Sequence, residues 1–416
     1  MPNFMACLRA LTVLLVFMAP VASAAQNQWD RIDVGGIIQT TLPDGSERVL
    51  QPSCSGGPQL TAGGGIEPAS TEFYFFVQQG NPNKILIGLD GGGACWDAAT
   101  CVGSPLIGGS TYQVALDETV ESLAAAEGFF DARNPENPFH NYTKIFIPYC
   151  TGDVHWGSKD TVYALPTPQG PLPWLIHHRG TDNFLAVLDW LQRDGRKEYG
   201  VDLARARDVT VTGASAGGYG ANVAFAFVAE LTPRARLNLI SDAAIGVQTT
   251  SFFSTAIYNP ADPGSESWGV SQNLPPWVPG FDETLLQMGA ANPNGFVPSV
   301  FFALSAYRPD AHFASLTSNL DLVQIGFYGL MRGVFPPDAL IAGEWYFSMA
   351  AMTAFTAALP NYRFFIDAGT FHTFIGSNER VYEVGANGIS LADWVRAMIK
   401  PGDRTWENLN AGPPTP

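Results

Sequence analysis

Short apolar runs recur along this chain, and segments with helical periodicity lie between or after them. Near-continuous apolar runs of this length are typical of strands that are buried on both faces of a sheet. The runs cover 71–78, 84–90, 144–149, 208–213, 237–242 and 362–367, and the helical segments cover 183–192, 221–230, 344–359 and 391–400. This order predicts an α/β fold in which a mostly parallel central sheet carries helices on both faces.

The composition describes a loop-rich protein with an apolar core. Charged residues make up 14% of the chain, against about 25% in a typical soluble domain, and there are 43 glycines and 31 prolines. A disordered chain would instead need high charge and few aromatic residues. The net charge of −16 argues against nucleic acid as a partner, because binding to phosphates depends on Lys and Arg.

The first 24 residues are predicted to be a secretory signal peptide. Arg9 supplies positive charge, residues 10–19 form a short apolar core, and Ala-Ser-Ala at 22–24 fits a cleavage site. The core is too short to span a bilayer comfortably, and no apolar run of spanning length follows, so we expect no stable membrane insertion. An uncleaved anchor helix is the alternative. We therefore expect a secreted protein, extracellular or periplasmic, with a single catalytic domain over 25–416.

The cysteines predict disulfides and argue against a metal site. Cleavage would remove Cys7 from the 5 cysteines, and the even number left in an exported chain predicts two disulfides. Cys95 and Cys101 would close a short loop, which leaves Cys54 to pair with Cys150. A structural zinc site is the alternative, but the Cys95–Cys101 spacing is too long and no His pair follows at the right distance. We expect no metal and no cofactor.

One segment, 249–309, departs from the strand and helix patterns. It is rich in Pro, Gly, Ser and aromatic residues. We expect an irregular insertion over the carboxyl edge of the sheet, a candidate lid or substrate platform. The alternative is a surface excursion without a functional role.

The strongest chemical signal is the sequence Gly-Ala-Ser-Ala-Gly at 213–217. It follows the predicted strand 208–213 and opens an apolar helix, which is the strand–turn–helix context of a nucleophile elbow. The turn is sharp, so the serine needs small neighbours. Ser215 is therefore the predicted nucleophile, and an ordinary Gly-rich turn is the alternative.

A second signal is the glycine triplet 91–93, which follows the predicted strand 84–90. In α/β-hydrolases a Gly-rich loop after an early strand supplies one N–H of the oxyanion hole, and the residue after the nucleophile supplies another. We assign Gly92, Gly93 and Ala216 as these donors. A tight turn or a phosphate loop is the alternative, although the triplet lacks the spacing of nucleotide-binding motifs.

The general base and the acid should follow the nucleophile in the order Ser, Asp, His. Only two histidines, His312 and His372, follow Ser215. His372 comes just after the predicted strand 362–367, where a loop at the carboxyl edge would present it, so it is the predicted base. Chain order alone leaves several acids open: Asp242, Asp262, Asp282, Asp310, Asp321, Asp338 and Asp367.

A polar–aromatic cluster follows the predicted strand 144–149. It consists of Asp153, His155 and Trp156, and its place at the same edge of the sheet predicts a role in shaping the acyl or alcohol pocket. A structural turn is the alternative.

Several segments are similar to motifs of the pectinacetylesterase family, which includes Notum-like serine carboxylesterases. They cover 89–96 followed by Cys101, then 148–153, 213–219, 241–242 and 319–324, in the family's order. The resemblance implies an α/β-hydrolase-like serine esterase in which Asp321, three residues before Gln324, is the acid. Asp242 is the serious rival, because it ends a strand soon after the elbow.

We therefore expect a serine carboxylesterase that hydrolyses an ester through an acyl-enzyme. An acetylated polysaccharide such as pectin is one expected substrate, and lipid, polyester or protein-acyl esters are the alternatives. A catalytically inactive binding protein of the same fold is a third interpretation. It is disfavoured because the serine, the histidine, a candidate acid and the glycine loop are all present.

Overall fold

The computed structural model describes residues 28–413 except 120–125, 384 and 401. The predicted signal peptide at 1–24 therefore lies outside the described residues. Within the described part of the chain, no helix combines the length and the apolar character needed to cross a membrane.

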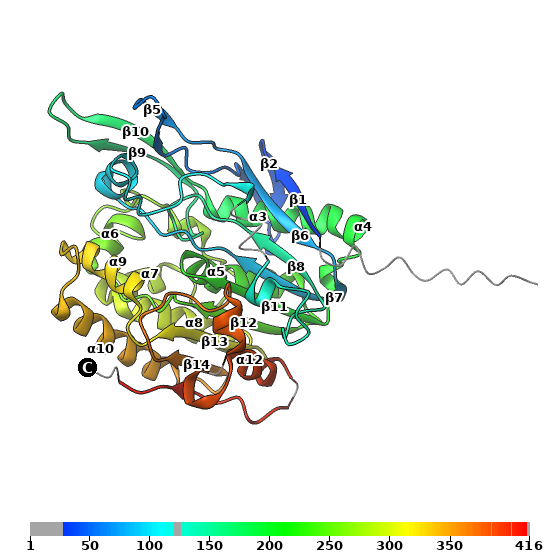
Figure 1. Ribbon diagram of the computed structural model, residues 1–416. Helices are drawn as coiled ribbons and strands as arrows, with labels where there is room; N and C mark the ends of the chain where they lie inside the picture. Colours follow the sequence, from blue (N-terminus) through cyan, green and yellow to red (C-terminus); the bar gives the residue numbers. More distant parts are fainter. Residues whose placement is uncertain (1–27, 120–125, 384, 401, 414–416) are drawn as a thin grey trace, which may run out of the picture.

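The core of the molecule is a nine-stranded sheet with the order β1-β6-β8-β7-β11-β12-β13-β14-β15 (Figure 1). In chain order its strands are β1 (Trp29–Val34), β6 (Phe73–Gln78), β7 (Asn81–Leu89), β8 (Tyr142–Ile147), β11 (Asp208–Ala214), β12 (Arg236–Asp242), β13 (His312–Ser318), β14 (Tyr362–Asp367) and β15 (Leu409–Asn410). The β1–β6 and β6–β8 pairs are antiparallel, and the other pairs are parallel. The predicted mostly parallel sheet is confirmed.

Alternate residues of the strands contact different layers of helices, as the period of two requires. Ile85 and Ile87 share a buried cluster with side chains of α3 (Gly180–Trp190), α5 (Ala216–Leu231) and α8 (Phe296–Tyr307). Leu86, between them, belongs to a second buried cluster that includes α12 (Leu391–Ile399). Both faces of the sheet are therefore covered, which explains why its strands are near-continuously apolar.

The remaining elements surround this core. The other strands form hairpin-like pairs: β2 (Ile38–Thr41) with β3 (Glu47–Leu50), β4 (Pro58–Leu60) with β5 (Ile66–Pro68), and β9 (Lys159–Leu165) with β10 (Leu172–His178). The other α-helices are α1 (Ser104–Leu106), α4 (Arg196–Tyr199), α6 (Thr250–Ala256), α7 (Glu283–Ala291), α9 (Leu322–Arg332), α10 (Ala339–Thr356) and α11 (Asn378–Tyr382). In Figure 1, α9 and α10 lie on the opposite side of the molecule from β2.

The segment 249–309 is more regular than its composition predicts, because it contains α6, α7 and α8. Thr249 caps α6 by accepting a hydrogen bond from the Phe252 N–H, and Asp282 caps α7 in the same way. Pro298 lies in the first turn of α8, where a missing N–H costs nothing. The expectation of an irregular insertion is wrong for these three helices, and the role as a lid remains a prediction.

Both predicted disulfides are present. Cys54 pairs with Cys150, just after β8, and Cys95 pairs with Cys101, just after the glycine triplet. The first bridge ties the N-terminal region to the carboxyl edge of the sheet. The second closes the loop that begins at this edge.

Candidate active site

Ser215 lies at a sharp turn between the end of β11 and the first residue of α5. Its φ of 56° is in the left-handed region that L-residues rarely adopt, so the turn must be held by its surroundings. A Cβ on Gly213 would lie 2.0 Å from the Gly217 carbonyl oxygen, and one on Gly217 would lie 2.0 Å from the Leu89 carbonyl oxygen. Only glycine fits at these two positions, which accounts for the spacing of the motif.

His372 lies in the loop that follows β14, and it faces a carboxylate. Its Nδ1 is 2.8 Å from Oδ2 and 2.9 Å from Oδ1 of Asp321. An ionised carboxylate only accepts hydrogen bonds, so Nδ1 carries the proton and Nε2 is left with its lone pair. Nε2 is buried and has no hydrogen-bond partner in the described part of the chain. This nitrogen is therefore free to accept a proton.

Asp321 follows β13 and is fully buried at the N-terminus of α9. Its Oδ1 accepts hydrogen bonds from the N–H groups of Val323 and Gln324, both at 3.0 Å. Its Oδ2 accepts one from Nε2 of Gln324 at 2.9 Å. These bonds fix the carboxylate and satisfy N–H groups that the helix leaves unpaired. The Asp-x-x-Gln spacing thus places both residues on the first turn of one helix.

Asp242, the rival acid, bonds elsewhere. Its Oδ2 accepts hydrogen bonds from the N–H groups of Phe374 at 2.6 Å and Ile375 at 2.9 Å, which come just after His372. Burial is the largest effect on this carboxyl group and raises its pKa to about 7. The geometry therefore favours Asp321 as the partner of the imidazole, with Asp242 holding the loop that carries it.

The glycine triplet lies beside Ser215 and offers N–H groups that could bind an oxyanion. The loop is held by hydrogen bonds from Ala94 N–H to Thr111 and from Gln113 N–H to Gly92. Among the described residues, the N–H groups of Gly92 and Gly93 have no acceptor within the chain. Gly93 has a φ of 80°, and a Cβ there would lie 2.0 Å from the Thr111 carbonyl oxygen.

The third assigned donor, Ala216, is the first residue of α5, so its N–H has no acceptor within the helix. Ala216 lines the same pocket as Gly93 and Ser215. The N–H groups of a helix start also carry the positive end of the helix dipole. This arrangement suits a developing negative charge on an oxygen next to Ser215.

Ser215 and His372 line one pocket together. Its wall is mainly apolar and aromatic: Ala94, Val154, Trp156, Tyr219, Val247, Phe252, Ile257, Trp268, Val297, Val323, Phe327, Met331 and Trp345. A second, more open groove shares Ser215, Gly93 and His372 with this pocket. The two residues therefore lie where an enclosed apolar space meets an open groove.

The sequence model of the family described as Pectinacetylesterase matches residues 69–261. The predicted resemblance to the pectinacetylesterase family is confirmed. The matched segment contains the glycine triplet and Ser215, whereas Asp321 and His372 lie beyond it. The assignment of these two residues therefore rests on their geometry.

The Wnt deacylase Notum from Drosophila has a similar structure, with 15% sequence identity and a TM-score of 0.50. The similarity covers 83% of this chain and 93% of the Notum chain. It supports the α/β-hydrolase-like fold that the sequence predicts. The search among curated proteins found no match for this chain.

The predicted cluster after β8 divides into a pocket residue and two supporting residues. Trp156 lines the pocket, and its Nε1–H donates to the Tyr219 carbonyl oxygen at 2.8 Å. Asp153 is buried away from both cavities and accepts hydrogen bonds from Thr151 Oγ1 and the N–H groups of His155 and Gly180. For Asp153 the structure thus matches the alternative of a structural turn.

His155 supports the loop that contains the glycine triplet 91–93. Its Nε2–H donates to the Asp90 carbonyl oxygen at 3.0 Å, directly before the triplet. Burial lowers the pKa of His155 to about 4, so it is neutral at physiological pH. It lines neither of these two cavities, and its role in shaping the pocket stays a prediction.

Most of the pocket wall was not predicted as functional. Phe252, Trp268 and Val297 come from 249–309, and Met331 and Trp345 come from α9 and α10. The only sequence signal was the richness of 249–309 in aromatic residues. Apolar side chains at helical spacing otherwise predict only residues of the hydrophobic core.

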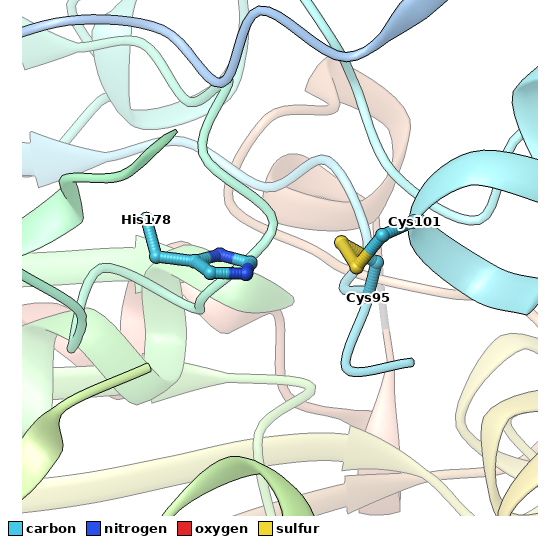
Figure 2. Close-up of side chains that lie close together, drawn as sticks. All are labelled: Cys95, Cys101 and His178. Carbon is cyan, nitrogen blue, oxygen red and sulfur yellow. A yellow bond between two sulfur atoms is a disulfide. The ribbon is translucent and has the colours of Figure 1, made fainter. Parts of the chain in front are cut away.

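Cys95, Cys101 and His178 lie close together, in a cluster of a kind that can bind metal ions (Figure 2). The two sulfurs are joined in a disulfide, so neither is a thiolate ligand. The ring nitrogens of His178 are also engaged: Nδ1 with the Thr151 carbonyl oxygen and Nε2 with the Tyr163 hydroxyl, both at 2.9 Å. These donors do not fit a metal site.

Proposed function

We propose that this protein is a secreted serine carboxylesterase that hydrolyses its substrate through an acyl-enzyme. One observation carries the proposal: Ser215 at its elbow and the unpartnered Nε2 of His372 line one pocket, while Nδ1 bonds to the buried Asp321. The match to the pectinacetylesterase family supports an ester as substrate. The predicted signal peptide and the two disulfides support export.

In the first half of the reaction, Ser215 Oγ attacks the ester carbonyl carbon and His372 Nε2 takes the hydroxyl proton. Asp321 keeps the second proton on Nδ1 and stabilises the imidazolium. The oxyanion accepts hydrogen bonds from Gly92, Gly93 and Ala216. The carbonyl then re-forms, the alcohol leaves with the proton from Nε2, and the acyl group remains on Ser215.

In the second half, a water molecule replaces the alcohol. His372 Nε2 takes a proton from the water as its oxygen attacks the acyl carbon. The same N–H groups stabilise the second oxyanion. Collapse of this intermediate releases the carboxylic acid and returns the proton to Ser215 Oγ.

The pocket supports an acyl group longer than acetyl. Trp156, Phe252 and Val297 line it, and each additional methylene group that is buried there gains about 0.8 kcal/mol. An acetyl group offers only one methyl group to this apolar wall. Acetylated pectin is the second candidate, because the matching family is named for that activity.

The nucleophile is tested with a fluorophosphonate probe. The wild type should be labelled and the Ser215→Ala variant should not, while Ser241→Ala serves as a matched control next to the same turn. Ser241 donates to the Gly218 carbonyl oxygen and does not line the pocket, so this variant should still be labelled. Labelling that persists in Ser215→Ala would show that another residue is the nucleophile.

The substrate is tested with nitrophenyl esters from acetyl to octanoyl, together with acetylated pectin and xylan. We expect kcat/KM to rise with chain length beyond acetyl. A maximum at acetyl with release of acetate from pectin would favour the second candidate. A folded wild type that neither reacts with the probe nor hydrolyses any ester would favour an inactive binding protein.

A further inference from the structure

Large apolar side chains lie exposed on α9, on α10 and in the loop between these helices. Leu322 and Val323 are 58% and 39% exposed, Phe335 is 67% exposed, and Leu340 and Phe347 are 68% and 72% exposed. We call these five residues the apolar rim. Single exposed apolar residues are common, but a set gathered on two packed helices and the loop that joins them marks an interaction surface.

The rim carries little charge. Residues 322–356 include three charged side chains, and each is engaged within this segment. Arg332 forms an ion pair with Glu344, and Asp338 caps α10 by accepting a hydrogen bond from the Ile341 N–H. None of them is left to bind an ionic partner at the rim.

The rim is continuous with the candidate active site. Leu322, Val323 and Phe335 line the open groove together with Ser215 and His372. Leu340 and Phe347 are seven residues apart on α10, so they lie on one exposed face of that helix. Any partner that covers the rim therefore also covers the entrance to the site.

We propose that the apolar rim docks the enzyme on the surface of an uncharged lipid–ester particle, from which ester molecules enter the site. The proposal rests on the proposed esterase function and adds the physical state of the substrate. Three rim residues line the groove that leads to Ser215, so we expect the rim to contact the particle that contains the ester substrate. The net charge of −16 disfavours an anionic membrane, and the exposed side chains that define the rim are all apolar, which disfavours a polysaccharide.

The test measures docking without catalysis. Ser215→Ala protein is mixed with trioctanoylglycerol droplets, and the fraction that floats with the droplets is determined. Adding Leu340→Ser and Phe347→Ser should weaken this association by about tenfold or more, since each change removes a large apolar side chain from the interface. The control adds Ile37→Ser and Val49→Ser, which are 72% and 56% exposed near β2 and on β3. The control should float like the parent.

Activity on a dissolved ester separates the two proposals. The Leu340→Ser/Phe347→Ser enzyme with Ser215 intact should hydrolyse dissolved nitrophenyl butyrate like the wild type, but lose about tenfold on emulsified trioctanoylglycerol. Parent protein that does not float, or equal floating of the rim and control variants, would overturn docking while leaving the esterase intact. A dimer that dissociates in the rim variant would also overturn it, because the surface would then join two copies of the chain. Docking without hydrolysis of any ester would instead refute the esterase.

Discussion

The change Asp321→Asn tests the proposed acid at a single atom. An asparagine can keep its oxygen where Oδ1 accepts the N–H groups of Val323 and Gln324 at 3.0 Å. Its NH₂ group then replaces Oδ2, where it meets two donors, Nε2 of Gln324 and Nδ1–H of His372. The imidazole relieves this conflict by moving its proton from Nδ1 to Nε2, where it can no longer act as a base.

The effect on turnover should far exceed the effect on stability. The wrong tautomer costs about 10⁴-fold in kcat in the serine-protease template, which corresponds to about 5 kcal/mol of barrier. Stability loses one charge-assisted contact and gains an unpaired buried donor, a cost of about 1–3 kcal/mol. Asp321→Asn protein should therefore fold, and its kcat should fall by at least two orders of magnitude.

The assay compares kcat for nitrophenyl butyrate with the urea midpoint of unfolding for each variant. Asp242→Asn is the matched control, because an asparagine oxygen there can still accept the N–H groups of Phe374 and Ile375. This control should keep most of its turnover per folded molecule. Near-normal kcat in folded Asp321→Asn, with loss of activity in Asp242→Asn, would refute the reasoning and make Asp242 the acid.

Two further predictions concern stability. Burial raises the pKa of Asp242 from 3.8 to about 7, so the folded protein binds this proton more tightly than the unfolded chain, and ionisation costs stability as pH rises through this range. Between pH 5 and pH 8 the wild type should lose roughly 2–3 kcal/mol relative to Asp242→Asn in urea unfolding, and a difference that stays constant with pH would contradict this. The Cys54–Cys150 bridge spans 96 residues, and replacing both cysteines by alanine should cost about 4–5 kcal/mol on the chain-entropy account. Equal urea midpoints for the wild type and this double variant would exclude a stabilising role for the bridge.

The parts of the site that depend on backbone geometry were predictable from sequence. The turn at Ser215 admits only glycine at 213 and 217, and the loop after β7 needs glycine at 93. Such demands leave a local pattern that can be recognised without the fold. Strands such as β7 and β11 were also predictable, because each leaves a local pattern, a short and nearly continuous apolar run.

The acid was harder to choose, because the strand before it was missed. β13 reads His-Phe-Ala-Ser-Leu-Thr-Ser and has the polar residues Ser315, Thr317 and Ser318 in its second half, although it lies inside the sheet. One of them, Thr317, accepts a hydrogen bond from Gln324 Nε2 at 3.2 Å. The polar Thr317 thus helps to fix Gln324, which in turn donates a hydrogen bond to Asp321. His312 begins this strand and bonds to the Met398 carbonyl oxygen, away from the site.

The pocket could not be predicted residue by residue, since its wall is assembled from distant parts of the chain. Phe252 lies on α6, Val297 lies on α8, and Trp345 lies on α10. Each is an apolar residue in an apolar neighbourhood, and only the fold decides which of them faces Ser215. The exposed apolar side chains of α10 could not be predicted from the sequence for the same reason.

Asp321 has two structural duties that constrain how this chain can vary among descendants. It faces His372, and it caps the helix whose next two residues, Leu322 and Val323, border the groove. Inserting or deleting one residue directly after Asp321 would shift the acid by about 100° of helical rotation relative to the rest of α9. Changes in substrate range can therefore accumulate in 249–309 or along α10, whereas the spacing between Asp321 and α9 must be inherited unchanged.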